Sequence, residues 1–158
     1  NAAGALAAPQ QHPATDQRHR TAGRAEALSA AASIALLTLI AQVESTGQTR
    51  VLLLNDCPAG LEGFYVPSHN RIGLCRNNHS SDAALTSTLL HEAMHRLQHC
   101  RDPLLKDLLN ADNSVNMLEE EAISLQRWGQ HNFRSAADWL RRQLKTQCAA
   151  QPANSGRA

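Results

Sequence analysis

Hydrophobic residues recur along this chain with two different spacings, which predict where helices and strands lie. Apolar residues three and four positions apart indicate amphipathic helices, whereas short apolar runs between turn residues indicate buried strands. The helical spacing covers residues 24–44, 81–100, 113–128 and 135–148, and a short helix is expected at 103–109. Strands are expected at 50–55 and 71–76, with a shorter one at 63–66.

This order of elements predicts a single α+β domain, with mostly helices packed on a small sheet. Residues 1–22 are rich in Ala, Gln and Pro and show no apolar period, so we expect a disordered arm there. The domain is expected at 23–148, followed by a disordered tail at 149–158. We expect the strand at 71–76 to be an edge strand before the central helix, as in a zincin-like (gluzincin-type) fold, where a substrate peptide adds to that edge.

The helix at 81–100 carries His91-Glu92-Ala93-Met94-His95, an HExxH pattern. Two histidines four residues apart lie one turn apart on the same helical face, so both imidazoles can reach one metal ion. Zinc suits such a ligand set, and zinc activates a water molecule for attack on a peptide carbonyl. Glu92 is then the candidate general base. The alternative is an ordinary amphipathic helix whose two histidines are polar surface residues.

A third protein ligand is expected, because two histidines alone rarely hold zinc tightly. The longer HExxHxxGxxH pattern is absent, since Gln98 and Arg101 stand where its glycine and third histidine belong. The remaining candidates for the third ligand are the three glutamates at 119–121. Helical periodicity directs Glu120 away from the buried face, whereas it places Glu119 and Glu121 at equal angles on either side of that face. Helix geometry therefore does not decide whether Glu119 or Glu121 is the third ligand.

A family resemblance is carried by Ile72-Gly73-Leu74-Cys75-Arg76-Asn77-Asn78, by HEAMH, and by His99-Cys100-Arg101. These segments resemble the metalloprotease family of the mitochondrial intermembrane space that processes an ATP synthase subunit. The resemblance covers about residues 57–128, and it implies a zinc protease with a glutamate as third ligand. The family's downstream glutamate, followed by alanine three residues on and leucine six on, corresponds to Glu119. The same resemblance implies an alternative role as a non-proteolytic chaperone or assembly factor.

The chain departs from that family in carrying fewer cysteines and in having Gln98 where an acidic residue is common. Its four cysteines, Cys57, Cys75, Cys100 and Cys148, contain no CxxC pair, so a separate zinc knuckle is not expected. The sequence does not decide whether these cysteines form two disulfides or remain as four reduced thiols. Cys75 and Cys100 flank the central helix and are candidates for a bridge between strand and helix.

The composition of the chain limits which classes of partner it can bind. A formal net charge of +1 and 3% aromatic residues argue against a nucleic-acid partner and leave a protein or peptide substrate. The apolar stretch 30–41 is too short to span a bilayer, so we expect a buried helix there and no integral membrane segment. We expect a soluble protein, in the intermembrane space by resemblance or else bacterial or secreted. Neither the substrate sequence nor the oligomeric state follows from the sequence.

Stabilising the oxyanion of a peptide-cleavage reaction needs a hydrogen-bond donor beside the metal. Three side chains are candidates for that donor: Tyr65, His69 and His131. Each has the alternative of being an ordinary surface polar residue.

Overall fold

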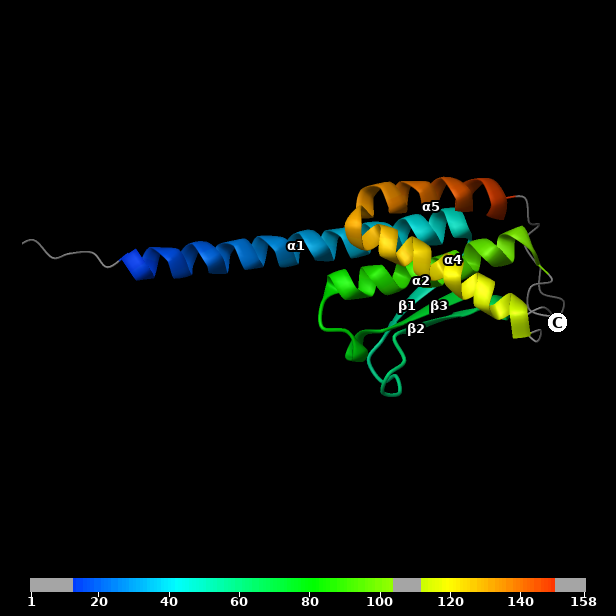
Figure 1. Cartoon of the computed structure of the whole chain (residues 1–158), viewed down its shortest axis with the longest axis horizontal. Coiled ribbons are helices and arrows are strands. Elements are labelled where there is room, and N and C mark those ends of the chain that lie inside the picture. Colours follow the sequence, from blue (N-terminus) through cyan, green and yellow to red (C-terminus); the bar gives the residue numbers. More distant parts are fainter. Residues whose placement is uncertain (1–12, 104–111, 150–158) are drawn as a thin grey trace, which may run out of the picture.

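The structure, a computed structural model, describes residues 13–103 and 112–149. Helices dominate the described part of the chain, and a small mixed sheet forms the other layer (Figure 1). The helices are α1 (Pro13–Gly47), α2 (Asp82–Arg101), α4 (Asp112–His131) and α5 (Phe133–Cys148). The strands are β1 (Arg50–Leu54), β2 (Gly63–Val66) and β3 (Arg71–Cys75), with 3₁₀ turns η1 (Pro67–His69) and η2 (Arg76–Asn78). The α+β class is confirmed, and the short helix expected at 103–109 falls almost wholly outside the described residues.

The sheet has the order β1-β3-β2. β1 pairs parallel to β3, and β2 pairs antiparallel to β3 on its other side. A tight connection through η1 joins β2 to β3, and it closes with Asn70 in the left-handed region at φ 46°. The expectation that 71–76 is an edge strand is therefore wrong: β3 is central, and β2 is an edge strand. The reason is that β1 occupies the side of β3 that a simple hairpin would leave open.

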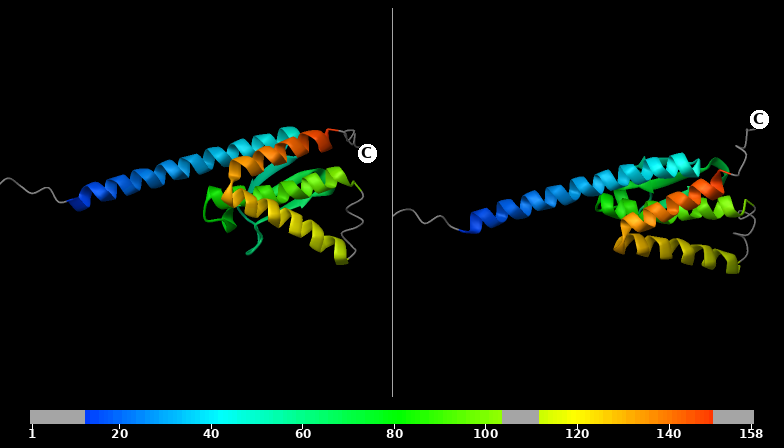
Figure 2. Two further views of the ribbon diagram at one scale, coloured as in Figure 1. Left: turned by 45° about the horizontal axis from the view of Figure 1, so that its top comes forward. Right: turned by 90° about the horizontal axis from the view of Figure 1, so that it is seen from above.

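Helix α2 is the centre of the packing. The four described helices lie on one side of the sheet, and α2 runs between the sheet and the other helices (Figure 1). Its large apolar side chains are almost fully buried, and Leu89, Ala93 and Leu97 are at 0% exposure. Figure 2 shows α5 running along the C-terminal half of α1, where Leu39 and Leu144 join the same core. A functional side chain on α2 therefore projects from a rigid element.

Helix α1 is longer than the sequence predicts. It begins at Pro13, so the expected disordered arm is wrong for residues 13–22, where alanine, arginine and glutamine favour helix and proline starts it. Residues 1–12 lie outside the described residues. Within α1, Leu36, Leu39 and Val43 are buried, whereas Ile34 and Leu37 are exposed on the opposite side. The stretch predicted to be a buried helix is therefore buried along one face only.

Length and composition allow one segment of the described residues, Ser29–Gly47 in α1, to cross a membrane. Its mean hydropathy is 1.3, and 22% of the window is buried in the protein. A core helix of a soluble protein meets the same criterion, so no integral membrane segment is established.

Helix α4 continues past residue 128, where the predicted helix ends just before Gly129, and it ends at His131. A Cβ atom on Gly129 would lie 2.1 Å from Cδ1 of Leu90, so this glycine serves the close approach of α4 to α2 rather than helix termination. Asn132 then caps α5 by accepting a hydrogen bond from the backbone N–H of Ser135.

All four cysteines form disulfides, Cys57–Cys75 and Cys100–Cys148. The suggested bridge between Cys75 and Cys100 is wrong. Cys75 lies at the end of β3, before α2 begins, whereas Cys100 lies in the last turn of α2. The length of α2 therefore separates these two cysteines, and each pairs with a cysteine of another segment. One bridge fastens the loop after β1 to the end of β3, and the other fastens the end of α5 to the end of α2. The second bridge fixes α5 beside the C-terminal turn of the central helix.

Candidate metal centre

The two histidines of the HExxH pattern project from one face of α2, as their spacing predicts. Ser81 begins this helix by accepting a hydrogen bond from the backbone N–H of Ala84, and Asp82 lies in the first turn. The Nε2 atoms of His91 and His95 lie 3.2 Å apart. Both side chains are largely covered, with 17% and 19% exposure. The helix therefore presents two converging imidazole nitrogens to one point.

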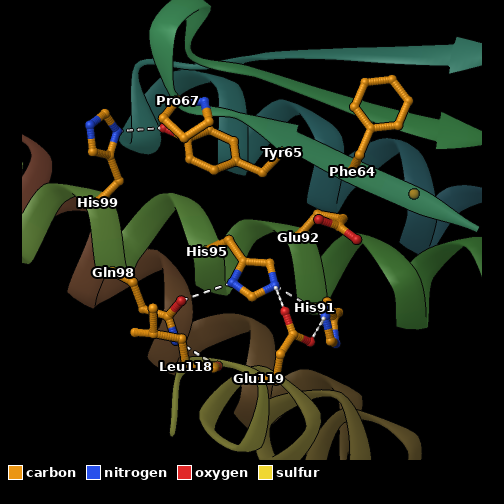
Figure 3. A pocket seen from close by; sticks show the side chains of 11 residues that line it. Phe64, Tyr65, Pro67, His91, Glu92, His95, Gln98, His99, Leu118 and Glu119 are labelled. Atoms are coloured by element: carbon orange, nitrogen blue, oxygen red, sulfur yellow. Dashed lines mark hydrogen bonds and ion pairs between the residues drawn. The ribbon is translucent and has the colours of Figure 1, made fainter. Parts of the chain in front are cut away.

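Glu119 on α4 completes a three-residue cluster at that point (Figure 3). Its Oε2 lies 3.3 Å from Nε2 of His91, and its Oε1 lies 3.2 Å from Nε2 of His95. Glu120 is exposed, as the helical period predicts. Glu121 turns instead to an ion pair with Arg101. The structure thus brings Glu119, rather than Glu121, to the two histidines.

Two glutamines fix the outer nitrogens of these imidazoles. Nδ1 of His95 lies 2.8 Å from Oε1 of Gln98, and Nδ1 of His91 lies 3.2 Å from Oε1 of Gln126. Because a glutamine Oε1 only accepts, each Nδ1 carries the proton and each Nε2 of a neutral ring presents a lone pair. Burial and the neighbouring His95 lower the pKa of His91, which favours that neutral form. Four hydrogen-bond acceptors, two nitrogens and two carboxylate oxygens, therefore face one another.

Glu92 lies beside this cluster in a position shielded from water. Its exposure is 7%, and burial, with Glu119 nearby, raises the pKa of Glu92 from 4.5 to about 8. β2 approaches closely here, because a Cβ atom on Gly63 would lie 3.2 Å from Cγ of Glu92 and 2.7 Å from Cγ2 of Thr88. Glycine at this position allows the edge strand to lie directly over the carboxylate.

A pocket of about 410 Å³ contains the cluster. Its walls come from β2 and η1 on one side, from α2 along the floor, and from Leu118 and Glu119 of α4 on the other side (Figure 3). His91, Glu92 and His95 all line it. The pocket therefore combines the expected site residues with the exposed edge of a strand.

Of the three candidate oxyanion donors, Tyr65 alone lines this pocket; His69 and His131 are not among the residues that form its walls. The Tyr65 hydroxyl lies 2.8 Å from Nδ1 of His99 and 3.1 Å from Oδ1 of Asn70. Arg96 also donates to this hydroxyl, at 3.3 Å. His99 lines the pocket but lies outside the His91–His95–Glu119 cluster, because it stands two turns beyond His91 on α2.

A profile of the Peptidase M76 family matches residues 20–153, which is most of the chain. The chain belongs to the Peptidase M76 family. This membership confirms the resemblance found in the sequence, and it makes the chain a member of a metallopeptidase family whose substrates are peptides or proteins. Searches of curated proteins and of solved structures found no match.

Three residues of this Peptidase M76 member were missed by the sequence analysis. Gln98 and Gln126 contact the two imidazoles, and Arg96 is 1% exposed inside the motif helix. Arg96 donates to the carbonyl oxygen of Gly47 at the end of α1 and to Oδ1 of Asn70. Gln98 stands three residues after His95, so helical spacing alone could have identified it as a neighbour of that ring.

Proposed function

We propose that this Peptidase M76 member is a zinc-dependent metalloendopeptidase with a zincin-like fold. His91, His95 and Glu119 would hold the ion, and Glu92 would act as general base. The observation that carries the proposal is the cluster of acceptors: three side chains direct lone pairs at one point, with Glu92 immediately beside it.

The chemistry of the donor set fits zinc. Nitrogen and carboxylate oxygen are ligands that zinc accepts, and two histidines with one glutamate are a common set for a catalytic zinc. The glutamine acceptors behind His91 and His95 keep the Nε2 lone pairs available. Without a cation, the acceptors within 3.2–3.3 Å of one another would repel. A divalent cation at this point relieves that repulsion.

When bound, zinc supplies Lewis-acid chemistry, polarising a carbonyl and lowering the pKa of water to about 7. The positive charge also favours the ionised form of Glu92, which can then take a proton from water and deliver it to the leaving amine. A substrate segment fits along the free edge of β2, where backbone hydrogen bonds would hold it beside Glu92. Gly63 leaves the backbone of this edge close to the carboxylate.

We further propose that the protein works in an oxidising compartment, either the mitochondrial intermembrane space or the outside of a bacterial or other cell. The two disulfides support this placement, because such bonds persist where thiols are not kept reduced.

The test combines metal content with hydrolysis of unfolded protein substrates. Wild-type protein should bind one zinc, Glu119→Ala should lose it, and Glu120→Ala, a matched change at the exposed neighbour, should retain it. Glu92→Gln should keep zinc and lower the hydrolysis rate by about 10²–10⁴-fold.

Two outcomes would contradict this proposal. A wild-type protein that takes up no zinc has no metal centre. A Glu92→Gln variant with undiminished activity has a different catalytic base. Zinc binding without hydrolysis of any substrate would favour the assembly-factor alternative, for which Glu92→Gln should have no consequence.

A further inference from the structure

Gln98 is a buried polar side chain whose contacts are all defined. It is 2% exposed and lies on the last turns of α2, three residues after His95. Its Nε2 donates to the carbonyl oxygen of Leu118 at 2.9 Å and to Oε2 of Glu121 at 3.0 Å. Its Oε1 lies 2.8 Å from Nδ1 of His95. The amide thus lies between α4 and one imidazole of the cluster (Figure 3).

The orientation of this amide follows from its partners. A backbone carbonyl and a carboxylate both accept only, so the group facing them must be the NH₂. Reversing the amide would set its oxygen against two acceptors and would leave the NH₂ facing His95. Oε1 is therefore held toward Nδ1 of His95, and the ring must donate from Nδ1. The lone pair is thereby directed from Nε2 into the cluster.

Glu121 stabilises this orientation from behind. Its Oε2 accepts from Gln98, and its Oε1 pairs with Arg101, whose Nε donates to Oε1 of Gln147 on α5 at 3.0 Å. Arg101 and Gln147 each adjoin a cysteine of the Cys100–Cys148 disulfide. The chain of hydrogen bonds therefore ends on two helices that are covalently joined.

We propose that Gln98 is a positioning residue that selects the metal-binding tautomer of His95, and that Glu121 acts through it. The inference rests on the proposed function, because it assigns these residues a purpose only if His95 holds a metal. The inference also gives the two acids of α4 different roles. Glu119 faces the metal position, whereas Glu121 orients the amide of Gln98, which in turn orients His95. Hydrogen-bond partners of ligating histidines commonly change metal affinity by about 10–100-fold.

The central variant is Gln98→Met, which keeps the length of the side chain and removes both polar ends. Gln130→Met is the matched control, because Gln130 is an exposed glutamine of α4 that bonds to Ser87 rather than to the cluster. Glu121→Ala and the double variant Gln98→Met/Glu121→Ala complete the set. Thermal unfolding of each metal-free protein shows which variants fold.

Two measurements distinguish positioning from simple structural support. Nitrogen-15 NMR of the metal-free protein reports which nitrogen of His95 carries the proton; we expect Nδ1–H in wild type and Gln130→Met, and a shift toward Nε2–H in Gln98→Met. Competition with a chromophoric chelator gives zinc affinity; we expect about 10–100-fold weaker binding for Gln98→Met and no change for Gln130→Met.

The double variant tests whether Glu121 acts through Gln98. Glu121→Ala should weaken zinc binding by itself, by less than Gln98→Met does, and should add no further loss once Gln98 is methionine. Additive losses would overturn this part of the inference. Because Glu121→Ala leaves Gln98 in place, it also tests the inference if Gln98→Met does not fold: unchanged tautomer and affinity would then overturn it.

The result for wild type keeps the two proposals apart. If wild type binds no zinc, the proposed function fails. If wild type binds zinc tightly while Gln98→Met shows an unchanged His95 tautomer and unchanged affinity, the metal centre stands and the role of Gln98 is wrong.

Discussion

Helix α2 carries two polar networks that differ in how their hydrogen bonds are satisfied. Around Arg96, a guanidinium meets the acceptors of Gly47 and Asn70 and the Tyr65 hydroxyl, so donors face acceptors. Around His91 and His95, lone pairs face the carboxylate of Glu119 and each other. The first network is complete within the protein. The second directs acceptors at one point, which is the arrangement that the proposed metal centre needs.

The two networks also connect different parts of the molecule. Arg96 fastens the end of α1 to the connection between β2 and β3, and so assembles the fold around α2. The histidine cluster joins α2 to α4 through the carboxylate of Glu119, which is 47% exposed, and through Gln126, whose Oε1 lies 3.2 Å from Nδ1 of His91. Changes in the first network should therefore lower stability, whereas changes in the second should alter metal binding. Four measurements test this distinction.

The largest expected effect is stabilisation by zinc. Zinc at about a thousand times its dissociation constant should raise the free energy of unfolding by about 4 kcal/mol, because it binds the folded state. Urea unfolding with zinc and with EDTA measures the increment. Arg96→Met should keep it, and Glu119→Ala should lose it. An equal increment in Glu119→Ala would show that zinc binds elsewhere.

The next effect concerns pH in the metal-free protein. The pKa of Glu92 is raised to about 8 in the folded state, so its protonated form stabilises the fold. This contribution is complete below about pH 4.5 and is lost as the pH rises toward about 8, a loss of a few kcal/mol.

Urea unfolding in EDTA across that range, compared between wild type and Glu92→Gln, isolates this contribution. The advantage of Glu92→Gln over wild type should grow with pH and level off above about pH 8. Arg96→Met leaves Glu92 in place, so the curve of this variant should run parallel to that of wild type. Parallel curves for wild type and Glu92→Gln would contradict the expectation.

Arg96→Met should lower the free energy of unfolding by about 2 kcal/mol, because buried acceptors at Gly47 and Asn70 lose their donor. Chemical denaturation measures the loss, and zinc affinity should change less than threefold in the protein that remains folded. Arg142→Met, an exposed arginine on α5, is the control and should be nearly neutral. A large loss of zinc affinity in Arg96→Met would show that the two networks are not separate.

The smallest effect is expected for Tyr65→Phe. Its hydroxyl is engaged by Arg96, Asn70 and His99, so we expect a loss of about 1 kcal/mol in stability and a change of less than tenfold in hydrolysis. Steady-state kinetics and denaturation measure the two effects. A loss of activity of about 10²-fold or more would instead assign Tyr65 to oxyanion stabilisation.

The spacing of hydrophobic residues predicted those helices and strands whose signal lies within the element itself. The helical spacing of apolar residues predicted α2, and short apolar runs predicted β1 and β3. Sequence patterns predicted the wrong helix end where a residue is needed for packing between helices. Gly129 resembles a helix stop, but it allows α4 to contact Leu90. The alanine-rich start of α1 has no apolar period, yet its intrinsic helix propensity extends the helix to Pro13.

The sequence by itself determined that His91 and His95 share one helical face, because their spacing follows from the helix geometry alone. The family resemblance added Glu119. Only the tertiary structure decided what depends on how separate elements pack: that Glu119 faces the histidines while Glu121 turns to Arg101, that β2 is the edge strand, and which cysteines pair. These facts depend on the position of α4, β1 and α5 against α2. A local period carries no information about such distances between segments.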